Sequence, residues 1–383
     1  MSDVKNGALQ LNLENYTAGD GKLYLYVNQN QGTSFSAGKE SFTVSLGKEE
    51  LEVLNVQTVG ETGVPVTFLC LVDVSGSLDK NRMEVMKETL SCLAADMREG
   101  DSICIIAIGD ELRFSGFLTG KEEIQAQIDA LEVLHEDTNL YQGIEESLLL
   151  LQTDTSVSAK RCLLVLSDGA EDNTYGITRE EVNTRVQDSH IPIFTVGMIK
   201  NTGNQSQLDS VKILGSFART SAGGSHYVPA LDDLSAEQIA ENIWTSVLGS
   251  QVITVDTQGL APTGQELYLQ VSVNVEGIGA ASTGMNVADG NILSETPVET
   301  ESGSEETEAE ETESETTMET GTLQEEPAPT QGMNMLVVAG IGIGIVLLIV
   351  ILIVVFTRKK KKTSGNVQDH RSRKQYLSRN QNS

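Results

Sequence analysis

The sequence predicts a doubly wound, Rossmann-like α/β domain inserted in, or flanked by, an antiparallel β-sandwich, followed by a disordered acidic stalk and one transmembrane helix. Three observations support this. In residues 61–250, short apolar runs alternate with stretches of helical period. Residues 1–60 and 251–291 alternate apolar and polar positions, as strands with one buried face do. Met335 to Phe356 contains no charged residue.

The α/β region shows its elements as apolar runs between turn residues. Continuous apolar runs predict four buried strands: Val66–Val72, Ser102–Ile108, Arg161–Ser167 and Pro192–Val196. Apolar residues at helical spacing predict helices around Met83–Met97 and Leu140–Leu151, and a closing helix at Ala236–Leu248 whose Trp244 we expect in the core.

The two flanks each show few strands, at Leu23–Val27, Ser41–Leu46, Gln251–Val255 and Leu267–Val273. Because so few strands bury little surface alone, the simplest packing joins residues 1–60 and 251–291 into one β-sandwich with the domain 61–250 inserted. Two separate small β units are the alternative.

The C-terminal part has three compositional segments. Residues 291–330 hold 13 Glu and no Lys or Arg, so the segment 292–332 is expected to be a disordered, extended stalk. The apolar segment 333–357, with Met335 to Phe356 at its centre, is long enough for a membrane span. The tail 358–383 is basic and begins with Arg358, Lys359, Lys360, Lys361 and Lys362.

This charge distribution predicts the topology. The positive-inside rule places the tail in the cytoplasm and the large N-terminal part outside the cell membrane. Met1 begins no apolar export segment, so this orientation requires that a signal was removed or that the start is incomplete. A tail-anchored cytosolic protein is the alternative. Gly340 and Gly344 form a GxxxG pair that would allow a homodimer through the membrane helix.

Charge and cysteine content limit the partners and the chemistry. Net charge is −29, and once the stalk (−13) and tail (+8) are set aside the rest carries −24. Such acidity disfavours nucleic acid, whose affinity depends on Lys and Arg contacts to phosphate. The four cysteines, all in apolar runs of one domain, are expected to be buried, inert thiols, although a pairing of Cys92 stays open: Cys70, Cys92, Cys104 and Cys162.

Oxygen-bearing side chains follow three segments of the α/β region. Asp73, Ser75 and Ser77 end the first strand, Thr138 precedes a helix, and Asp168 ends a later strand. In open α/β sheets ligands bind at the carboxyl ends of strands, so we expect these side chains on one edge. Loops around Gly76, Asn139 and Gly169 would surround them.

These residues resemble the von Willebrand factor type A (VWA) domain and its metal-ion-dependent adhesion site, over about 61–250. The family motif is Asp-x-Ser-x-Ser, then a separate Thr, then a separate Asp, matched here by Asp73, Ser75, Ser77, Thr138 and Asp168. The resemblance implies that the serines bind a metal directly, the carboxylates bind directly or through water, and the threonine joins with conformation.

Hard oxygen donors favour Mg²⁺, with Mn²⁺ or Ca²⁺ as substitutes. Two carboxylates neutralise a divalent ion and the hydroxyls add no charge, so the ion keeps affinity for one external oxygen. The resemblance implies that this oxygen comes from an Asp or Glu of a protein ligand.

Alternative interpretations are open for single residues. Asp73 and Ser77 could cap the following helix, and Asp168-Gly169 could be a plain turn. His190 and His226 are expected to be structural. Glu171 and Asp172 are expected to be solvated loop charges, although they could tune the metal site.

The predicted function is a membrane-anchored extracellular receptor or adhesin. The alternative is a membrane scaffold or regulatory subunit whose VWA domain docks a partner in the same membrane. No Gly-x-Ser-x-Gly, CxxC or HExxH motif is present, so no enzymatic activity is expected.

Overall fold

The computed structural model describes residues 9–29, 37–173 and 175–293, which belong to one compact unit, Met1–Glu301. Most of the predicted stalk, the whole predicted membrane helix and the basic tail lie outside the described residues, as does the glycine pair. Within the described ranges, no helix is both long and apolar enough to cross a bilayer.

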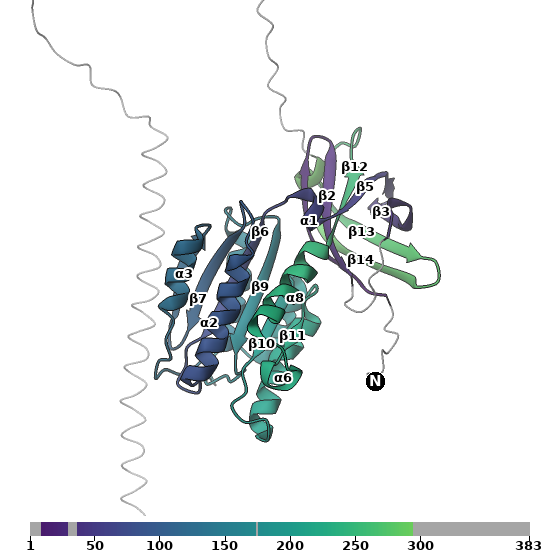
Figure 1. Ribbon diagram of the computed structural model, residues 1–383. Coiled ribbons are helices and arrows are strands. Elements are labelled where there is room, and N and C mark those ends of the chain that lie inside the picture. Colours follow the sequence, from purple (N-terminus) through teal and green to yellow (C-terminus); the bar gives the residue numbers. More distant parts are fainter. Residues whose placement is uncertain (1–8, 30–36, 174, 294–383) are drawn as a thin grey trace, which may run out of the picture. The chain divides into compact units, whose positions relative to one another are not determined.

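A six-stranded sheet forms the centre of the α/β domain (Figure 1). Its order is β11-β10-β9-β6-β7-β8, and neighbouring strands are parallel except for β8, which is antiparallel to β7. The strands are β6 (Val66–Asp73), β7 (Ser102–Ile108), β8 (Leu112–Leu118), β9 (Lys160–Ser167), β10 (Ile193–Gly197) and β11 (His226–Tyr227). Every residue of β6 is buried, as expected for a central parallel strand covered on both faces.

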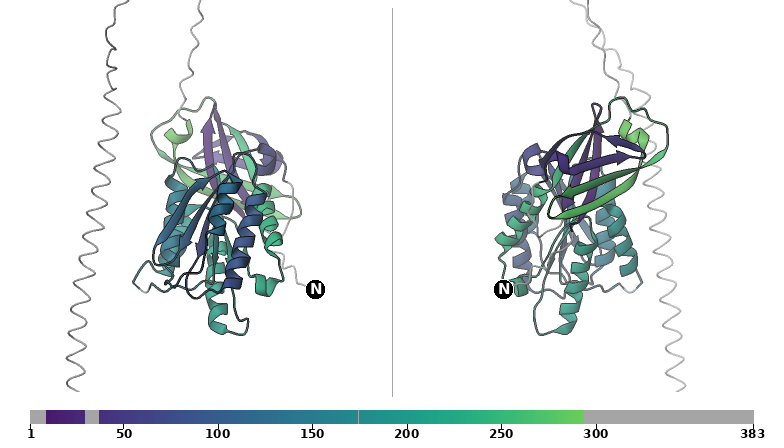
Figure 2. Two further views of the ribbon diagram at one scale, coloured as in Figure 1. Left: turned by 60° about the vertical axis from the view of Figure 1, so that its left-hand side comes forward. Right: turned by 90° about the vertical axis from the view of Figure 1, so that its right-hand side faces the viewer.

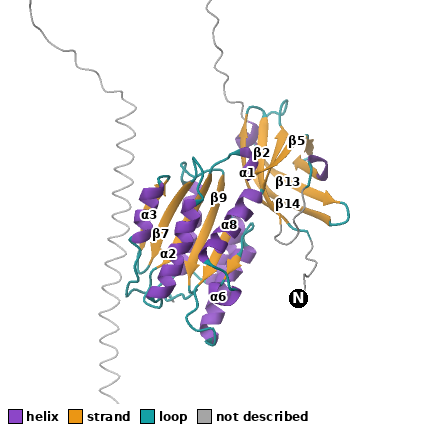
Figure 3. Cartoon of the chain, in the orientation of Figure 1, coloured by secondary structure: helices purple, strands orange, loops and turns teal. Residues whose placement is uncertain are grey.

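Helices cover both faces of this sheet, as predicted for a Rossmann-like α/β domain (Figures 1 and 3). The sheet is mixed and mostly parallel, because the unpredicted strand β8 is antiparallel to β7. One face packs against α2 (Lys80–Ala95), α3 (Lys121–Asp129) and α8 (Ala236–Gly249). The other packs against α4 (Leu140–Thr153), α5 (Arg179–Ser189) and α6 (Gln205–Thr220). Alternate residues of β6 divide between the two cores, because successive side chains of a strand point to opposite faces.

Trp244 of α8 lies in the first of these cores, as predicted. Its indole packs edge-on against Phe68, with ring centroids 5.0 Å apart, and its Nε1 donates to the Leu93 carbonyl at 3.0 Å. The apolar ring is therefore buried while its one polar atom stays hydrogen-bonded.

The cysteines form no disulfide. Cys70, Cys104 and Cys162 are buried in strands, and burial raises the pKa of Cys104 to about 11 and that of Cys162 to about 12. Because the thiolate is the reactive form, these thiols are inert near neutral pH. Cys92 departs from the prediction of full burial, since it lies partly exposed on α2.

Two four-stranded antiparallel sheets form a sandwich around a core of their own, separate from the two cores of the α/β domain. Each sheet combines strands from both ends of the described chain (Figure 2). The orders are β1-β2-β12-β5 and β14-β13-β3-β4. The strands are β1 (Leu11–Gly19), β2 (Lys22–Gln29), β3 (Phe42–Leu46), β4 (Glu49–Leu51), β5 (Val53–Thr58), β12 (Gln251–Asp256), β13 (Glu266–Val275) and β14 (Gly279–Ala288). Thr58 and Gln251 are register partners, so the chain leaves and re-enters the sandwich at adjacent positions.

Short helices complete the described chain: η1 (Lys39–Ser41), α1 (Val59–Thr62), α7 (Pro229–Asp232) and α9 (Asp289–Leu293). Helix α1 opens with a capping box in which Thr58 and Glu61 hydrogen-bond each other's backbone, and it ends at Gly63 in the left-handed conformation. This turn marks the passage from the sandwich into the α/β domain.

A bulge in β1 joins the sandwich to the start of β9. Leu13 pairs with Val27 and Asn15 with Tyr26, so Glu14 is the extra residue of the bulge. Its carboxylate lies 2.5 Å from Lys160 Nζ, and both side chains are buried. Asn15 Nδ2 also donates to the Ala159 carbonyl at 2.9 Å. The bulge thus aims one buried charge at another across the junction.

The two histidines that the sequence assigned structural roles lie in such positions. His190 ends α5 in the left-handed conformation and its Nδ1 lies 2.9 Å from the Leu13 carbonyl, beside the same junction. His226 is hydrogen-bonded through Nδ1 to Thr195 Oγ1 at 2.7 Å, and burial lowers its pKa.

We expect Glu14→Gln to lower the free energy of unfolding of residues 1–301 by about 3–5 kcal/mol, because it leaves the Lys160 ammonium buried and unpaired. Urea unfolding measures this. The double variant Glu14→Leu/Lys160→Met should recover most of the loss. Glu180→Gln, which removes the exposed partner of Arg179, is the control and should lower the free energy of unfolding far less. A loss for Glu14→Gln no larger than the control's would contradict a stabilising role of the buried pair.

Candidate functional site

The carboxyl ends of β6 and β9 place two aspartates at one edge of the sheet. The strands are parallel neighbours in which Val72 pairs with Leu166, so the next residues along, Asp73 and Ser167, also lie side by side. Asp168 follows directly. Parallel pairing alone therefore brings together two segments separated by more than ninety positions in the sequence.

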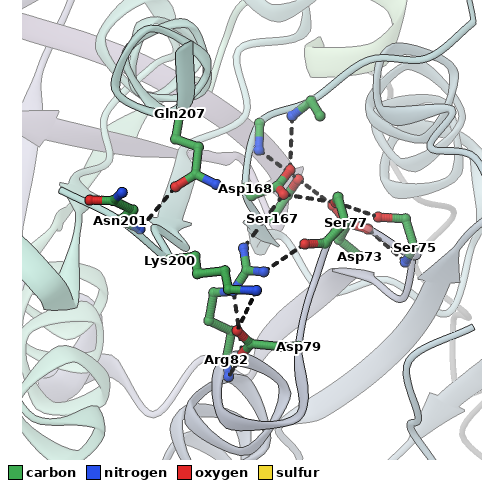
Figure 4. Close-up of polar contacts among 12 residues, drawn as sticks. Asp73, Ser75, Ser77, Asp79, Arg82, Ser167, Asp168, Lys200, Asn201 and Gln207 are labelled. Carbon is green, nitrogen blue, oxygen red and sulfur yellow. Dashed lines mark hydrogen bonds and ion pairs between the residues drawn. The ribbon is translucent and has the colours of Figure 1, made fainter. Parts of the chain in front are cut away.

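Four of the sequence-predicted residues form a continuous polar network at this edge (Figure 4). Asp73 Oδ1 accepts from the Ser75 backbone N–H at 2.9 Å. Ser75 Oγ and Ser77 Oγ are 3.0 Å apart, and Ser77 Oγ donates to Asp168 Oδ2 at 2.8 Å. The serine hydroxyls thus lie between the two carboxylates.

The helix that follows this turn is capped by a different residue. Helix α2 begins at Lys80, and the Asp79 carboxylate accepts from the Arg82 backbone N–H at 3.0 Å. The alternative in which Asp73 and Ser77 cap the helix is therefore wrong. Their oxygens face the site instead.

Thr138 lies on a loop that is fastened to the turn after β6. The Leu134 N–H donates to the Val74 carbonyl at 2.6 Å, and the Gly76 N–H donates to the Glu136 carbonyl at 3.1 Å. Thr138 itself is fully buried. Among the described residues its hydroxyl Oγ1 has no hydrogen-bond partner. A buried hydroxyl without a partner costs about 1–3 kcal/mol, so this oxygen is available to a ligand.

Glu171 and Asp172 were expected to be solvated loop charges, and this is wrong for Glu171. Its half-buried carboxylate accepts from the Tyr141 N–H at 2.7 Å, at the start of α4, and burial raises its pKa. The exposed Asp172 is also engaged, since its Oδ2 accepts from the Thr138 N–H and its own N–H donates to the Thr138 carbonyl, both at 3.0 Å. The two acids thus tie the Asp168 loop to the Thr138 loop.

The loops around Gly76, Asn139 and Gly169 lie next to these residues. Asn139 Nδ2 donates to the Asp110 carbonyl at 3.0 Å, so the β7–β8 turn also lies beside these loops. Gly169 has φ 77°, and a Cβ there would lie 2.4 Å from the Ser210 carbonyl oxygen. Only glycine permits both the left-handed backbone and this close approach.

The electrostatics of the site favour a cation. Burial raises the pKa of Asp73, hydrogen bonds from Ser167 and Ser75 lower it, and the nearby Asp168 raises it again. A buried carboxylate with a second carboxylate close by is costly to ionise unless positive charge is present. A divalent ion would offset that cost.

The donor set fits a hard cation such as Mg²⁺. It comprises two carboxylates and three hydroxyls, one of them the unpartnered Thr138 Oγ1. In residues 9–29, 37–173 and 175–293, no group of three or more His, Cys, Asp or Glu side chains is placed to hold a metal, so such an ion would depend on hydroxyl oxygens. Oxygen donors are those that Mg²⁺ prefers.

Sequence reasoning missed two residues of the site. Ser167 Oγ donates to Asp73 Oδ2 at 2.7 Å and accepts from the Gly169 N–H at 2.9 Å, so it holds both strand ends together. Arg82 lies beside Asp168, with Nη1 3.7 Å from Oδ2, and its Nη2 donates to the Ser77 carbonyl at 2.6 Å. Position at the end of a strand was a signal for Ser167, whereas nothing in the sequence pattern separates Arg82 from an ordinary helix residue.

Comparison with known families identifies the domain. Residues 68–171 match the family model of the von Willebrand factor type A domain, a range that contains all five predicted site residues. This chain contains a VWA domain. A comparison with curated proteins found no match.

Solved structures with some similarity to the chain include three bacterial examples. An aerotolerance-related membrane protein from Bacteroides fragilis NCTC 9343 is 14% identical with a TM-score of 0.37, covering 48% of this chain and 98% of its own. The conserved hypothetical protein BatB from Bacteroides thetaiotaomicron is 13% identical with a TM-score of 0.36, covering 47% and 98%. The vWF domain of the type V pili tip protein Mfa5 from Porphyromonas gingivalis is 14% identical with a TM-score of 0.39, covering 48% and 96%.

We expect Gly169→Ala to destabilise residues 1–301 more than Gly63→Ala does. Both glycines are left-handed, which costs an alanine about 1–2 kcal/mol, but Gly63 has open space around it whereas Gly169 faces the Ser210 backbone. Thermal unfolding of the two variants measures the difference. Equal shifts in melting temperature would mean that the Asp168 loop relaxes freely and is not held as described.

Proposed function

We propose that this chain is a membrane-anchored, non-catalytic binding protein whose VWA domain uses a Mg²⁺-dependent site to bind an acidic group of a protein ligand outside the cell. A VWA domain by itself indicates protein–protein interaction or adhesion. The metal, the acidic group and the location are the further steps of the proposal.

The observation that carries the metal is the Thr138 hydroxyl. It is buried and without a partner in the described part of the chain, on a loop fastened to the Asp168 loop by two hydrogen bonds through Asp172. A fold normally satisfies its buried polar atoms, and exceptions require an explanation such as an ion. A bound cation would satisfy this oxygen and offset the costly ionisation of Asp73.

The residues proposed to hold the ion are Asp73, Ser75, Ser77, Thr138 and Asp168. A bound Mg²⁺ supplies a Lewis-acidic centre for one external oxygen. Asp73 and Asp168 balance its charge, and the neutral hydroxyls leave it able to attract a further anion. Ser167, Glu171 and Asp172 position these groups by hydrogen bonds. A carboxylate of a partner protein is the ligand chemistry that fits.

The membrane anchor rests on the sequence alone. The uncharged stretch Met335 to Phe356 is followed at once by basic residues, and the acidic segment before it contains no Lys or Arg from 291 to 330. As a stalk, this acidic segment would hold the binding domain away from an acidic bilayer surface, which the negative charge of the domain repels. A stalk of this kind favours a partner on another surface over one in the same membrane.

We expect calorimetric titration of residues 1–301 with Mg²⁺ to give heat that is absent in Asp73→Ala and Asp73→Asn. Both variants remove a charge required for the ion. Because ionised Asp73 is costly in the metal-free fold, Asp73→Asn should keep or raise the melting temperature measured in EDTA. Heat that persists in both variants would overturn the assignment of Asp73, and no heat in the wild type would overturn the metal site.

We expect Thr138→Val to weaken Mg²⁺ binding at least several-fold without lowering stability in EDTA, because it removes a buried hydroxyl that has no partner in the described structure. Thr195→Val is the matched control. Its hydroxyl bonds His226, so its loss should lower stability and leave Mg²⁺ affinity unchanged. If Thr138→Val lowered stability in EDTA as much as the control, the hydroxyl would be structural and not a metal ligand.

A further inference from the structure

A buried arginine lies against the proposed metal site. Arg82, in the first turn of α2, is only 6% exposed. Its Nη1 lies 3.7 Å from Asp168 Oδ2 and its Nε lies 3.5 Å from Asp79 Oδ1. Figure 4 shows the guanidinium between these two carboxylates. Lys200 Nζ lies 4.0 Å from Asp79 Oδ2.

The guanidinium is held firmly at one nitrogen and loosely at the others. Nη2 donates to the Ser77 carbonyl at 2.6 Å. Nε and Nη1 are buried and have no hydrogen-bond partner among the described residues, although both lie within ion-pair distance of a carboxylate. The Ser77 carbonyl therefore fixes the position of the guanidinium. Arg82 interacts with Asp168 electrostatically, without a hydrogen bond.

The Arg82 guanidinium adds one positive charge beside the proposed metal site. Asp73 and Asp168 together carry −2, which would neutralise a divalent ion. With Arg82 included, the loaded site has a net charge of +1. Burial reduces screening by water and salt, so the repulsion between Arg82 and a cation is larger than it would be on the surface.

We propose that Arg82 sets the affinity of this site: its fixed charge opposes the divalent cation, keeps metal binding weak, and leaves the loaded site positive toward an anionic partner. The inference rests on the proposed metal site and adds a residue that would never contact the metal. Asp79 partly compensates the charge of Arg82, because its carboxylate lies beside the same guanidinium. The same carboxylate also lies 4.0 Å from Lys200 Nζ.

The test is a titration of the full chain in mild detergent with Mn²⁺, in which electron paramagnetic resonance measures the free ion. Arg82→Gln and Arg82→Met should each bind Mn²⁺ roughly tenfold more tightly than the wild type, as expected for the loss of one nearby charge. Arg82→Lys, which keeps the charge, should stay within about threefold of the wild type. Arg179→Gln, which removes an exposed cation paired with Glu180, is the control and should change nothing.

The outcomes separate the two proposals. No Mn²⁺ binding by the wild type, or binding retained in Asp73→Ala, overturns the proposed metal site itself. Specific binding by the wild type with equal or weaker binding by Arg82→Gln and Arg82→Met overturns only the role of Arg82. If both of those variants fail to fold, Asp79→Asn provides the test. Asparagine also caps helices, so this variant should keep the fold. Without the Asp79 carboxylate, the charge of Arg82 is less compensated and should weaken Mn²⁺ binding several-fold. Unchanged affinity in Asp79→Asn would then overturn the inference.

Discussion

The parallel pairing of β6 with β9 is the constraint on which the site depends. Each strand is apolar and almost wholly buried, so neither can shift in register without moving side chains from one core to the other. That register sets Asp73 beside Ser167 and places Asp168 one residue beyond. The carboxylates are thus positioned by the hydrophobic packing of the sheet. Because the sheet fixes the spacing of Asp73 and Asp168, the hydroxyls of Ser75 and Ser77 in the turn after β6 can lie between the two carboxylates.

The two ends of β9 have different roles. Its first residue, Lys160, forms the buried ion pair with Glu14 of the sandwich, and its last, Ser167, hydrogen-bonds Asp73. The sandwich therefore meets the strand at its amino end, while the site occupies the carboxyl end, as is general for open α/β sheets. Insertion at adjacent positions of β5 and β12 adds a second attachment. A ligand at the carboxyl edge would consequently not compete with the sandwich for the same surface.

Strands buried on both faces were the easiest part of the structure to predict from the sequence. Strands covered on both faces, such as β6 and β9, appear as continuous apolar runs and were predicted almost to the residue. The edge strands β8 and β14 are largely uncovered, so neither shows an apolar run or a strict alternation, and both were missed. The same distinction holds in the site. The five motif residues have a fixed order in the sequence, whereas Arg82 and Glu171 act through distances that only the folded chain defines. The expectation that Glu171 is solvated failed because the sequence does not show that its carboxylate meets the first turn of α4.

The charge of Arg82 also bears on how an acidic protein could use a metal. Outside the stalk and the tail, the chain carries −24, which attracts divalent cations in general and offers no selectivity. A site with two carboxylates and no opposing charge would bind such ions readily and stay filled at low concentrations. A buried arginine within ion-pair distance of one carboxylate would raise the concentration at which the site fills. It would also make the contribution of an external carboxylate larger, because the ligand would then neutralise the remaining positive charge of the site. Extracellular modules that bind Ca²⁺ work at about 10⁻⁴–10⁻³ M. A site weakened in this way would be suited to such conditions, with loading and partner binding coupled through charge and not through a large change of shape.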